Sequence, residues 1–323
     1  MAIRVFHSAV EWAGAISGRS ILTIGNFDGI HRGHQAILQA VTRESRACGT
    51  CASGAITFEP HPVKFLRPAE APLLLSTLHA RVIAFQTYGL DAALVLPFNE
   101  HLARVTPEEF VRKFLVEKLR TQKILVGANF RFGHRHAGDV ALLETLGRQL
   151  GYEVLIVPPV TFRGQVVSSS AVRQAAGDGN MARAAQMLGH PLCLTGRIIA
   201  GEGRGRQLGF PTLNMAWQQE LLPPPGVYVT STLLEKVWME SVTNVGYRPT
   251  FGGSAMSVES HVLSTDYGAI TATSGPIEVG FFRRLREERK FPSPEALREQ
   301  IQADVNRAKR YWDRYALFQQ ARA

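Results

Sequence analysis

The chain has 323 residues, of which 45% are hydrophobic and 20% are charged, and its formal net charge is +9. This composition supplies enough apolar residues for two packed domains and excludes a disordered chain. The basic residues are dispersed rather than gathered in one run, so charge alone does not predict binding to nucleic acid, and small anionic substrates explain it equally well.

No apolar run approaches the ~20 residues that span a bilayer, and the first residues lack the apolar segment of a secretory signal. We therefore expect a cytoplasmic protein without a membrane partner. The three cysteines also favour a reducing compartment. Cys48 and Cys51 have the spacing of a redox pair, but no second pair or Cys/His cluster completes a zinc site, and we expect no redox or metal role for them.

The first two predicted elements meet in a glycine-rich turn. The apolar run Ile21–Ile24 predicts a buried strand, and apolar residues at helical spacing from His34 onward predict a helix. Gly25 and Gly33 allow the backbone to turn and to approach another group closely. His31 lies three residues before His34, so both imidazoles share one face at the start of the helix, where free N–H groups favour phosphate. The stretch predicts a site for a nucleotide triphosphate.

Two common phosphate-binding motifs are excluded here. No lysine occurs between Ile3 and Glu59, so the stretch is not a Gly-Lys-Ser/Thr loop, and its glycines do not have the spacing of the dinucleotide fingerprint. Nucleotidyl transfer remains, a reaction in which histidines stabilise charge on the α-phosphate and the departing pyrophosphate. The simpler alternative is an ordinary loop with two surface histidines.

The sequence from Gly25 to His34, GNFDGIHRGH, resembles the signature of the nucleotidyltransferase superfamily in the form carried by bacterial bifunctional riboflavin kinase/FAD synthetases. The resemblance implies that His31 and His34 are catalytic in adenylyl transfer. It also implies ATP binding by the surrounding residues, which are Gly25, Asn26, Phe27, Asp28 and Gly33.

Strands and helices alternate as far as residue 157. Further strands are expected at 55–58, 92–96, 124–127 and 154–157, and helices at 77–88 and 107–119, the second capped by Thr106. This alternation predicts an α/β fold with a parallel, doubly wound, Rossmann-like sheet. Ligands bind at the carboxyl ends of such strands. Phe58 and His61, at the end of the second strand, are therefore expected to line the site.

The loop after the strand 124–127 carries aromatic, basic and amide side chains. Aromatic rings suit a flat heteroaromatic ligand, and the guanidinium of Arg131 suits a phosphate; an amphipathic surface loop is the alternative. The sequence VGANFRFG resembles the flavin-binding loop of the same family. The resemblance implies flavin binding by Asn129, Arg131 and Phe132, together with Phe58, and it places Asn129 against the isoalloxazine.

Three consecutive serines, at residues 168–170, lie at the start of a helix expected after residue 168. Serines at such a position usually only cap the helix, but beside a nucleotide site they and Arg173 also suit phosphate groups. The run SSSAVR resembles the family motif Ser-Ser-Thr-x-Ile/Val-Arg, which implies ATP binding by Ser169, Ser170 and Arg173. Ser170 keeps the hydroxyl of the usual threonine.

The texture of the sequence changes after Pro191. Short runs of alternating polarity, separated by Gly and Pro, predict a small antiparallel β-barrel. The helices before it match the bridge between the two domains of the family. We therefore expect an FMN adenylyltransferase domain over residues 1–188 and a riboflavin kinase domain over 189–323, which ends in a helix from Pro294 to Tyr315 capped by Ser293.

A glycine-rich basic loop opens the second domain. Backbone N–H groups of such a loop can wrap phosphate, although glycine also marks barrel corners. The sequence FPTLN resembles the riboflavin kinase Pro-Thr-Ala-Asn motif, and Thr212 and Asn214 share one face of a strand, where their oxygens suit Mg²⁺. The resemblance implies ATP binding by Gly201, Gly203, Arg206, Gly209, Pro211, Thr212 and Asn214, the last two also as metal ligands.

The segment Val258–Leu263 alternates as a strand and carries one carboxylate. A lone strand carboxylate usually faces solvent, but the family places its catalytic glutamate in this Val-Glu-x-x-x-Leu strand. The resemblance therefore implies that Glu259 accepts the proton of the ribityl hydroxyl. After Leu263 the sequence departs from the family pattern, so it does not assign the riboflavin side of the site.

The resemblance covers nearly the whole chain and implies an enzyme that phosphorylates riboflavin with MgATP and then transfers AMP from ATP to FMN. Its ligands would be Mg²⁺, ATP, riboflavin, FMN and FAD, with no nucleic-acid partner, and the sequence does not set an oligomeric state. Two alternatives stay open. One is a nucleotidyltransferase for another acceptor, such as a cytidylyltransferase, against which the loop at Asn129 argues; the other is a basic nucleic-acid-binding protein, for which no groove-reading motif is present.

Overall fold

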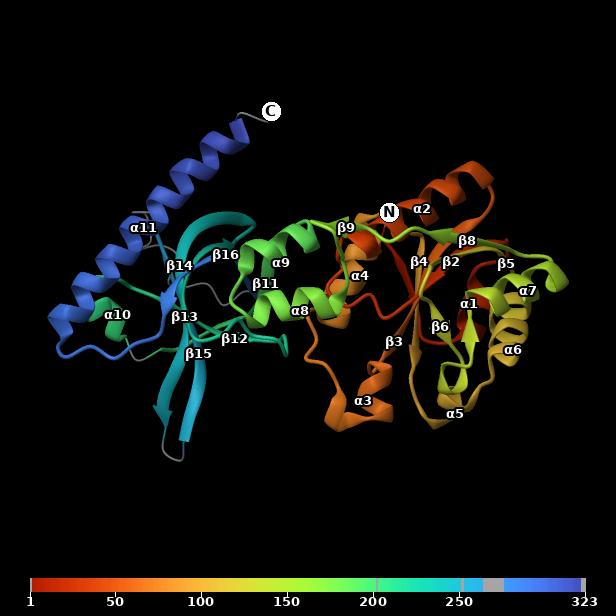
Figure 1. The fold of residues 1–323 in the computed structure, drawn as a ribbon, viewed down its shortest axis with the longest axis horizontal. Coiled ribbons are helices and arrows are strands. Elements are labelled where there is room, and N and C mark those ends of the chain that lie inside the picture. The colour runs from red at the N-terminus through yellow and green to blue at the C-terminus, as the bar shows by residue number, and fades with distance from the viewer. Residues whose placement is uncertain (1, 202, 251–252, 264–275, 321–323) are drawn as a thin grey trace. The chain divides into compact units, whose positions relative to one another are not determined.

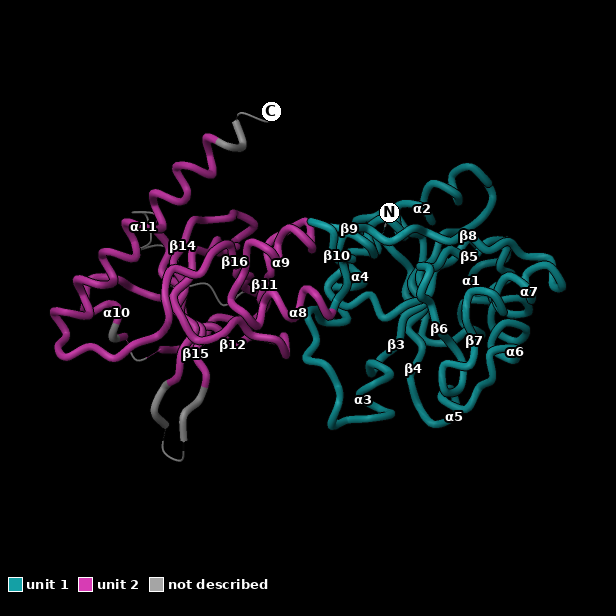
Figure 2. Tube along the Cα trace, in the orientation of Figure 1, with its two compact units in different colours: residues 1–169 teal, residues 170–323 magenta. Residues whose placement is uncertain are grey.

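The computed structural model describes residues 2–201, 203–250, 253–263 and 276–320, and it divides the chain into two compact units, residues 1–169 and 170–323 (Figure 1, Figure 2). Helix α8 (Ser169–Gly177) begins at this division, and α9 (Met181–Leu188) packs against the barrel strands of the second unit. The division thus comes before these helices. The sequence-based boundary between the two activities, after residue 188, stays a prediction.

The first unit is built on a six-stranded sheet in which every neighbouring pair is parallel. This confirms the predicted doubly wound sheet. The chain order reverses at β2, because β3 lies on one side of it and β5 on the other, and α/β folds bind ligands at the carboxyl end of such a switch point. The strand order is β1 (Arg4–Phe6), β4 (Ala92–Pro97), β3 (Ala52–Glu59), β2 (Ser20–Ile24), β5 (Thr121–Gly127) and β8 (Glu153–Val157).

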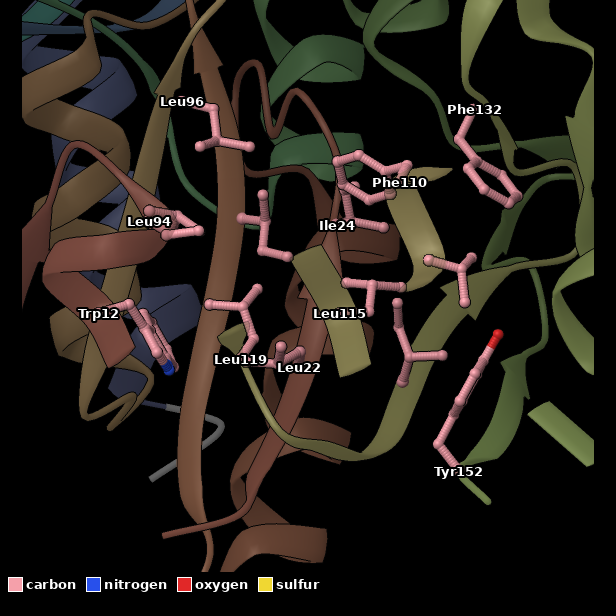
Figure 3. Packing of buried hydrophobic residues seen from close by; sticks show 14 of the residues in the cluster. Trp12, Leu22, Ile24, Leu94, Leu96, Phe110, Leu115, Leu119, Phe132 and Tyr152 are labelled. Carbon is pink, nitrogen blue, oxygen red and sulfur yellow. The ribbon is translucent and has the colours of Figure 1, made fainter. Parts of the chain in front are cut away.

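Helices cover both faces of this sheet because successive strand residues point to opposite sides. Leu22 and Ile24 pack with Trp12, Phe110 and Leu115 on one face (Figure 3), under α1 (Ala9–Ala15), α6 (Pro107–Glu109), η2 (Phe110–Lys118) and α7 (Val140–Leu150). The opposite face packs under α2 (Arg32–Cys48) and α4 (Leu78–Thr87). The shorter elements are α3 (Pro62–Leu66), η1 (Pro68–Glu70), α5 (Glu100–Arg104), β6 (Arg131–Phe132), η3 (His134–His136), β7 (Gly138–Asp139), β9 (Thr161–Phe162) and β10 (Gln165–Val166).

The helix predicted over residues 107–119 is present, but the number of residues per turn differs from that of the expected α-helix. A capping box at Thr106 starts it, as expected, but residues 110–118 form a π-helix. The wider turn brings Phe110, Leu115 and Leu119 onto one face, and all three are buried in the core. These three residues are spaced five and four apart in the sequence, which matches the repeat of a π-helix better than the 3.6-residue repeat of an α-helix.

The N-terminal strand β1 and helix α1 were not predicted. The strand has three residues at the edge of the sheet, which is too short for a period to show. Helix α1 is held by its buried Trp12, whose ring lies where a Cβ on Gly54 of β3 would stand, 2.4 Å from its Cη2 atom. Tertiary packing, rather than local pattern, fixes both elements.

The second unit is a closed antiparallel barrel, as predicted. Its terminal helix packs on the outside of the barrel, where Trp312 meets Val227, Val229 and Val242, and Ser293 caps that helix by accepting a hydrogen bond from Ala296 N (3.2 Å). The barrel order is β11 (Leu192–Ile199), β12 (Leu213–Trp217), β15 (Gly253–Val262), β14 (Val237–Thr250), β13 (Gly226–Leu234) and β16 (Pro276–Glu287), with α10 (Arg204–Gln207) and α11 (Pro294–Gln320) as its further helices.

Two further observations concern the expectations from composition. Cys48 and Cys51 form a disulfide, which the sequence did not predict. Spacing alone could not distinguish a bonded pair from two free thiols, since that depends on the geometry of the turn between them. Within the described parts of the chain, no helix is long and apolar enough to cross a membrane.

Candidate active sites

The loop between β2 and α2 is held in an unusual backbone conformation. Phe27 and Ile30 have positive φ angles of 52° and 42°, and Gly29 has a φ of 82°. Such a conformation is unfavourable for a bulky residue, so burial must hold it: Phe27 is 1% exposed and Ile30 is 5% exposed. The ring of Phe27 packs edge-on against Phe85 of α4 at 5.1 Å. The loop is therefore fixed by the core beneath it.

The two histidines of this loop lie together. The rings of His31 and His34 are stacked, with centroids 3.7 Å apart and an interplanar angle of 18°. His31 caps α2, because its Nδ1 accepts a hydrogen bond from the backbone N–H of His34 (3.3 Å). The proton of the neutral His31 ring is therefore on Nε2. A Cβ on Gly33 would stand 3.1 Å from the His31 ring, so glycine leaves the space that this ring occupies.

Burial lowers the pKa of His34 well below its ordinary value, and the neighbouring His31 lowers it further. His34 is therefore neutral at pH 7. Its Nδ1 is buried and has no hydrogen-bond partner among the residues that the structure describes. The site thus offers hydrogen bonds from two imidazole rings. The ring of His34 carries no full positive charge.

This lowered pKa predicts a pH dependence of stability. Below pH about 6.5 the unfolded chain protonates His34 and the folded chain does not, so the free energy of unfolding falls as the pH falls. We expect His34→Gln to lose less stability between pH 7.5 and pH 5.5 than the unchanged protein, as measured by urea unfolding. His79→Gln, at an exposed position on α4, is the matched control. Equal losses in the two variants would contradict the prediction.

The side chain of Asp28 joins the loop to residues 75–76. Its carboxylate accepts hydrogen bonds from the backbone N–H groups of Leu75 (2.9 Å) and Ser76 (3.0 Å). Its carbonyl oxygen accepts one from the hydroxyl of Ser169 (2.8 Å). Ser169 therefore touches the histidine loop, as its assignment requires. ATP binding by Asp28 stays a prediction.

Ser170 and Arg173 lie on α8 in the second unit, Ser170 exposed and Arg173 half-buried. Their ATP-binding role stays a prediction, as do the roles of Gly25 and Asn26.

A buried arginine that the sequence did not single out supports the carboxyl ends of β2 and β3. The guanidinium of Arg81, 2% exposed, donates from Nη1 to the carbonyl of Asn26 (3.1 Å), the hydroxyl of Thr57 (3.1 Å) and the carbonyl of Phe58 (3.3 Å). Its Nη2 pairs with the carboxylate of Glu59. An arginine four residues before the buried Phe85, and so on the same helix face, was the available signal, since a buried charge needs fixed partners.

Replacing this arginine should destabilise the first unit. Arg81→Met keeps much of the volume but removes one donor from each of the carbonyls of Asn26 and Phe58, and we expect a loss of about 3 kcal/mol in the free energy of unfolding. Arg81→Lys keeps the charge and should lose less. Urea unfolding measures both, and a methionine variant as stable as the unchanged protein would show that these hydrogen bonds contribute nothing net.

The residues predicted to bind flavin fall into two groups. Asn129 is exposed in the turn after β5, and Arg131 is exposed and pairs with Asp139 (3.4 Å). Phe132 is 7% exposed and lies in the core, stacked on Phe130 at a centroid distance of 5.5 Å. In this loop the side chain of Phe132 packs in the core, whereas the side chains of Asn129 and Arg131 are exposed to solvent.

Phe58 and His61 lie at the carboxyl end of β3, as expected. Phe58 is half-buried and packs edge-on against Phe98 at 5.9 Å. His61 is buried and caps α3, with its Nδ1 accepting from the N–H of Val63 (3.3 Å). That both residues line the site stays a prediction.

A second set of polar groups lies on three neighbouring barrel strands. Glu259 of β15 stands directly opposite Asn214 of β12 and Asn244 of β14. Thr212 donates its hydroxyl hydrogen bond to the Glu259 carboxylate (3.4 Å). Leu213, between the two predicted metal ligands, is buried at 4% exposure, and Asn214 is buried at 7%.

The glycine-rich loop approaches these strands closely. A Cβ on Gly201 would stand 1.9 Å from Nδ2 of Asn214, so only glycine allows this approach. Gly203 and Gly209 have positive φ angles of 73° and 86°, and Arg206 is exposed on α10 between them. The carbonyl of Pro211 accepts a hydrogen bond from Nδ1 of His261 (2.7 Å), which holds the end of the loop against β15.

The donor chemistry of this set fits Mg²⁺. The hydroxyl of Thr212 and the amide oxygen of Asn214 are hard oxygen ligands of the kind that this ion prefers beside phosphates. No group of three or more His, Cys, Asp or Glu side chains suited to a metal occurs in the described ranges. Residues 264–275, where the sequence analysis made no assignment for the riboflavin side of the site, lie outside the described residues.

Comparison with known proteins identifies the family of each part of the chain. Residues 14–171 match the FAD synthetase family and residues 188–312 match the riboflavin kinase family. The bifunctional riboflavin kinase/FMN adenylyltransferase of Escherichia coli K12 is 35% identical over 90% of this chain and 92% of its own length, and that of Pseudomonas fluorescens is 37% identical over the same shares.

Solved structures show the same fold. A crystal structure from Streptococcus pneumoniae, described as a macrolide-efflux protein, matches with a TM-score of 0.83 and 26% identity, covering 95% of this chain and 99% of that one. The sequence relatives and the two family matches span both units. The chain therefore belongs to the family of bifunctional riboflavin kinase/FMN adenylyltransferases.

Proposed function

We propose that this chain catalyses two successive reactions: phosphorylation of riboflavin by ATP to FMN, and adenylylation of FMN by ATP to FAD and pyrophosphate. The observation that carries the proposal is that one chain holds two separate sets of groups. The stacked rings of His31 and His34 follow β2 in the first unit, and the Thr212–Glu259 pair lies on the barrel of the second. Each set suits a different transfer from ATP.

In adenylyl transfer the phosphate of FMN attacks the α-phosphorus of ATP, and the bond to the departing pyrophosphate breaks. No protein nucleophile is required, so the protein positions the substrates and stabilises charge. His31 donates from Nε2, and His34, neutral because its pKa is lowered, contributes a hydrogen bond. Asn129 and Phe58 would contact the isoalloxazine and Arg131 the FMN phosphate, in keeping with their place at the carboxyl edge of the sheet.

In the kinase reaction the 5′-hydroxyl of riboflavin attacks the γ-phosphorus of ATP, and ADP leaves. Glu259 accepts the proton of this hydroxyl, and the Thr212 hydrogen bond orients its carboxylate. Mg²⁺, held by Thr212 and Asn214, would neutralise charge on the ATP phosphates. The close approach of Gly201 to Asn214 brings the backbone N–H groups of the glycine-rich loop toward the same place.

The partners implied by these reactions are small molecules. ATP and flavins are both present in the cytoplasm, which is where we propose that the enzyme acts. We propose no nucleic-acid partner, since the basic residues are scattered through the sequence.

Incubation with riboflavin and MgATP, with FMN and FAD resolved by chromatography, tests the proposal. We expect FMN to appear first and FAD to follow. A parallel reaction with FMN and CTP in place of ATP tests the alternative of a cytidylyltransferase and should give no product. Absence of both FMN and FAD from folded protein, or transfer from CTP in preference to ATP, would refute the proposed function.

A further inference from the structure

We propose that Cys48 and Cys51 form a reversible thiol–disulfide pair, a redox modification site at the edge of the sheet opposite the histidine loop. The two cysteines are bonded, with their Cα atoms 5.7 Å apart. Cys48 is the last residue of α2, and Cys51 directly precedes β3. The pair therefore closes the short connection between these two elements.

Its position separates the pair from the catalytic groups. The parallel strands of the sheet all run the same way, so the start of β3 lies at the amino edge, whereas the loop that carries His31 follows the carboxyl end of β2. Helix α2 joins the two edges, since it begins after His31 and ends at Cys48. Oxidation of the pair thus leaves the groups proposed to bind ATP chemically unchanged.

The surroundings of the pair suit the reduced state as well as the oxidised one. The side-chain oxygen of Gln122 on β5 lies 2.8 Å from Sγ of Cys51 and 3.6 Å from Sγ of Cys48. A thiol donates a hydrogen bond to an amide oxygen, and a disulfide sulfur has no proton to donate. Reduction therefore gives Gln122 a donor that the disulfide cannot supply.

A cavity of about 690 Å³ opens beside Cys51 of the pair. Cys51 lines this cavity together with Arg4, Arg46 and Asp91. The Asp91 carboxylate is engaged by the N–H and hydroxyl of Ser53 (2.8 and 2.7 Å), and both arginines are exposed. The cavity thus borders Cys51, and Cys48 is the more exposed of the two cysteines, so each can meet a reagent.

The exchange proceeds in two balanced steps. In oxidation, a protein thiolate attacks a low-molecular-weight disulfide and releases one thiolate of the reagent, and the second protein thiolate then displaces the other. Two protein thiols and one disulfide reagent thus become one protein disulfide and two reagent thiols. Cys48 is half-buried and Cys51 is 7% exposed, so the reagent reacts first at Cys48. On reduction Cys51 leaves as the thiolate, takes a proton and donates to Gln122.

The location proposed for the enzyme favours reversibility. Disulfides of cytoplasmic proteins are usually transient or redox-sensing, because the compartment keeps thiols reduced. A pair that is bonded in the structure and beside an accessible cavity fits that class better than a permanent cross-link. This step rests on the cytoplasmic location given under the proposed function, whereas the labelling test below is independent of flavin turnover.

The test equilibrates the full chain at fixed ratios of reduced to oxidised glutathione, then acidifies, denatures and alkylates it, and counts adducts at each cysteine by mass spectrometry. We expect Cys48 and Cys51 to gain their adducts together in one transition. Cys193 should be alkylated at every ratio, since burial raises the pKa of its thiol well above the ordinary value and so keeps it unreactive while the protein is folded. Full alkylation of the pair at the most oxidising ratio, or none at the most reducing, would overturn the proposal, as would a stable glutathione adduct in place of the internal bond.

Three variants sharpen the result. Cys193→Ser should leave the transition unchanged, and Cys51→Ser should abolish it. Gln122→Leu removes the hydrogen-bond acceptor of the reduced form. The glutathione ratio at the midpoint of the transition should therefore shift about 2–10-fold in the direction that favours the disulfide, the effect of one ordinary hydrogen bond. An unchanged midpoint in Gln122→Leu would refute the role given to this amide.

Discussion

Alanine at either histidine of the β2–α2 loop should abolish FAD formation and leave FMN formation intact. Each of these rings supplies hydrogen bonds to charge that develops at the α-phosphorus, and loss of one such donor typically reduces the rate about 10²–10³-fold. The rings of His31 and His34 are stacked with centroids 3.7 Å apart, so loss of either ring also removes the contact that positions the other. The rate of FAD formation from FMN and the rate of FMN formation from riboflavin, measured separately, check this expectation.

His31 needs a variant that separates its two roles, because its ring also caps α2. Alanine removes both the cap and the donor, and loss of the cap alone costs about 1 kcal/mol of stability. Asparagine is an effective cap but lacks the imidazole. His31→Asn should therefore keep the stability of the unchanged protein and still lose FAD formation.

The control for both variants is His79→Ala, at an exposed position on α4. It should form FMN and FAD at the normal rates. A folded His31→Asn protein that makes FAD at the unchanged rate would remove His31 from the catalytic groups, and loss of both activities in His34→Ala with the fold intact would argue against separate sites.

The order of strands and helices could be predicted because it depends on local patterns. A buried strand before a glycine turn, as at Ile21–Ile24, and a capped helix, as at Thr106, show in a few neighbouring residues. Strand β1 and the π-type repeat at 110–118 could not be predicted from the sequence, since each is decided by packing against distant elements. The disulfide belongs with them, because spacing alone does not fix the geometry of a turn.

The active sites divide in the same way. The pairing of His31 with His34 followed from their spacing at the start of a helix, and the structure brings the two rings together. The hydrogen bonds of Asp28 to residues 75–76, and those of Arg81 to Asn26, join segments that are about 50 residues apart in the chain. No local pattern indicates which distant backbone groups a carboxylate or a guanidinium will bind, so the supporting groups of the loop appear only in the fold.

In the second unit, Glu259→Gln should abolish FMN formation from riboflavin and leave FAD formation from supplied FMN unchanged. Glutamine keeps the size of the side chain and an oxygen that can accept the hydrogen bond of Thr212, which is 3.4 Å from the carboxylate. It cannot accept the proton of the attacking hydroxyl, and loss of a general base typically costs about 10²–10⁴-fold in rate. Because shape and hydrogen bonding are retained, the loss would report proton transfer rather than packing.

Two matched variants make the interpretation specific. Thr212→Val keeps the shape of the side chain but removes the hydroxyl that orients Glu259 and that we propose as a ligand of Mg²⁺, so FMN formation should fall and more Mg²⁺ should be needed for half-maximal rate. Glu235→Gln, at an exposed turn between β13 and β14, removes a carboxylate of the same barrel and should change neither activity. If Glu259→Gln forms FMN at the rate of Glu235→Gln, the proton must go elsewhere. The row Asn214–Glu259–Asn244 would then serve binding alone.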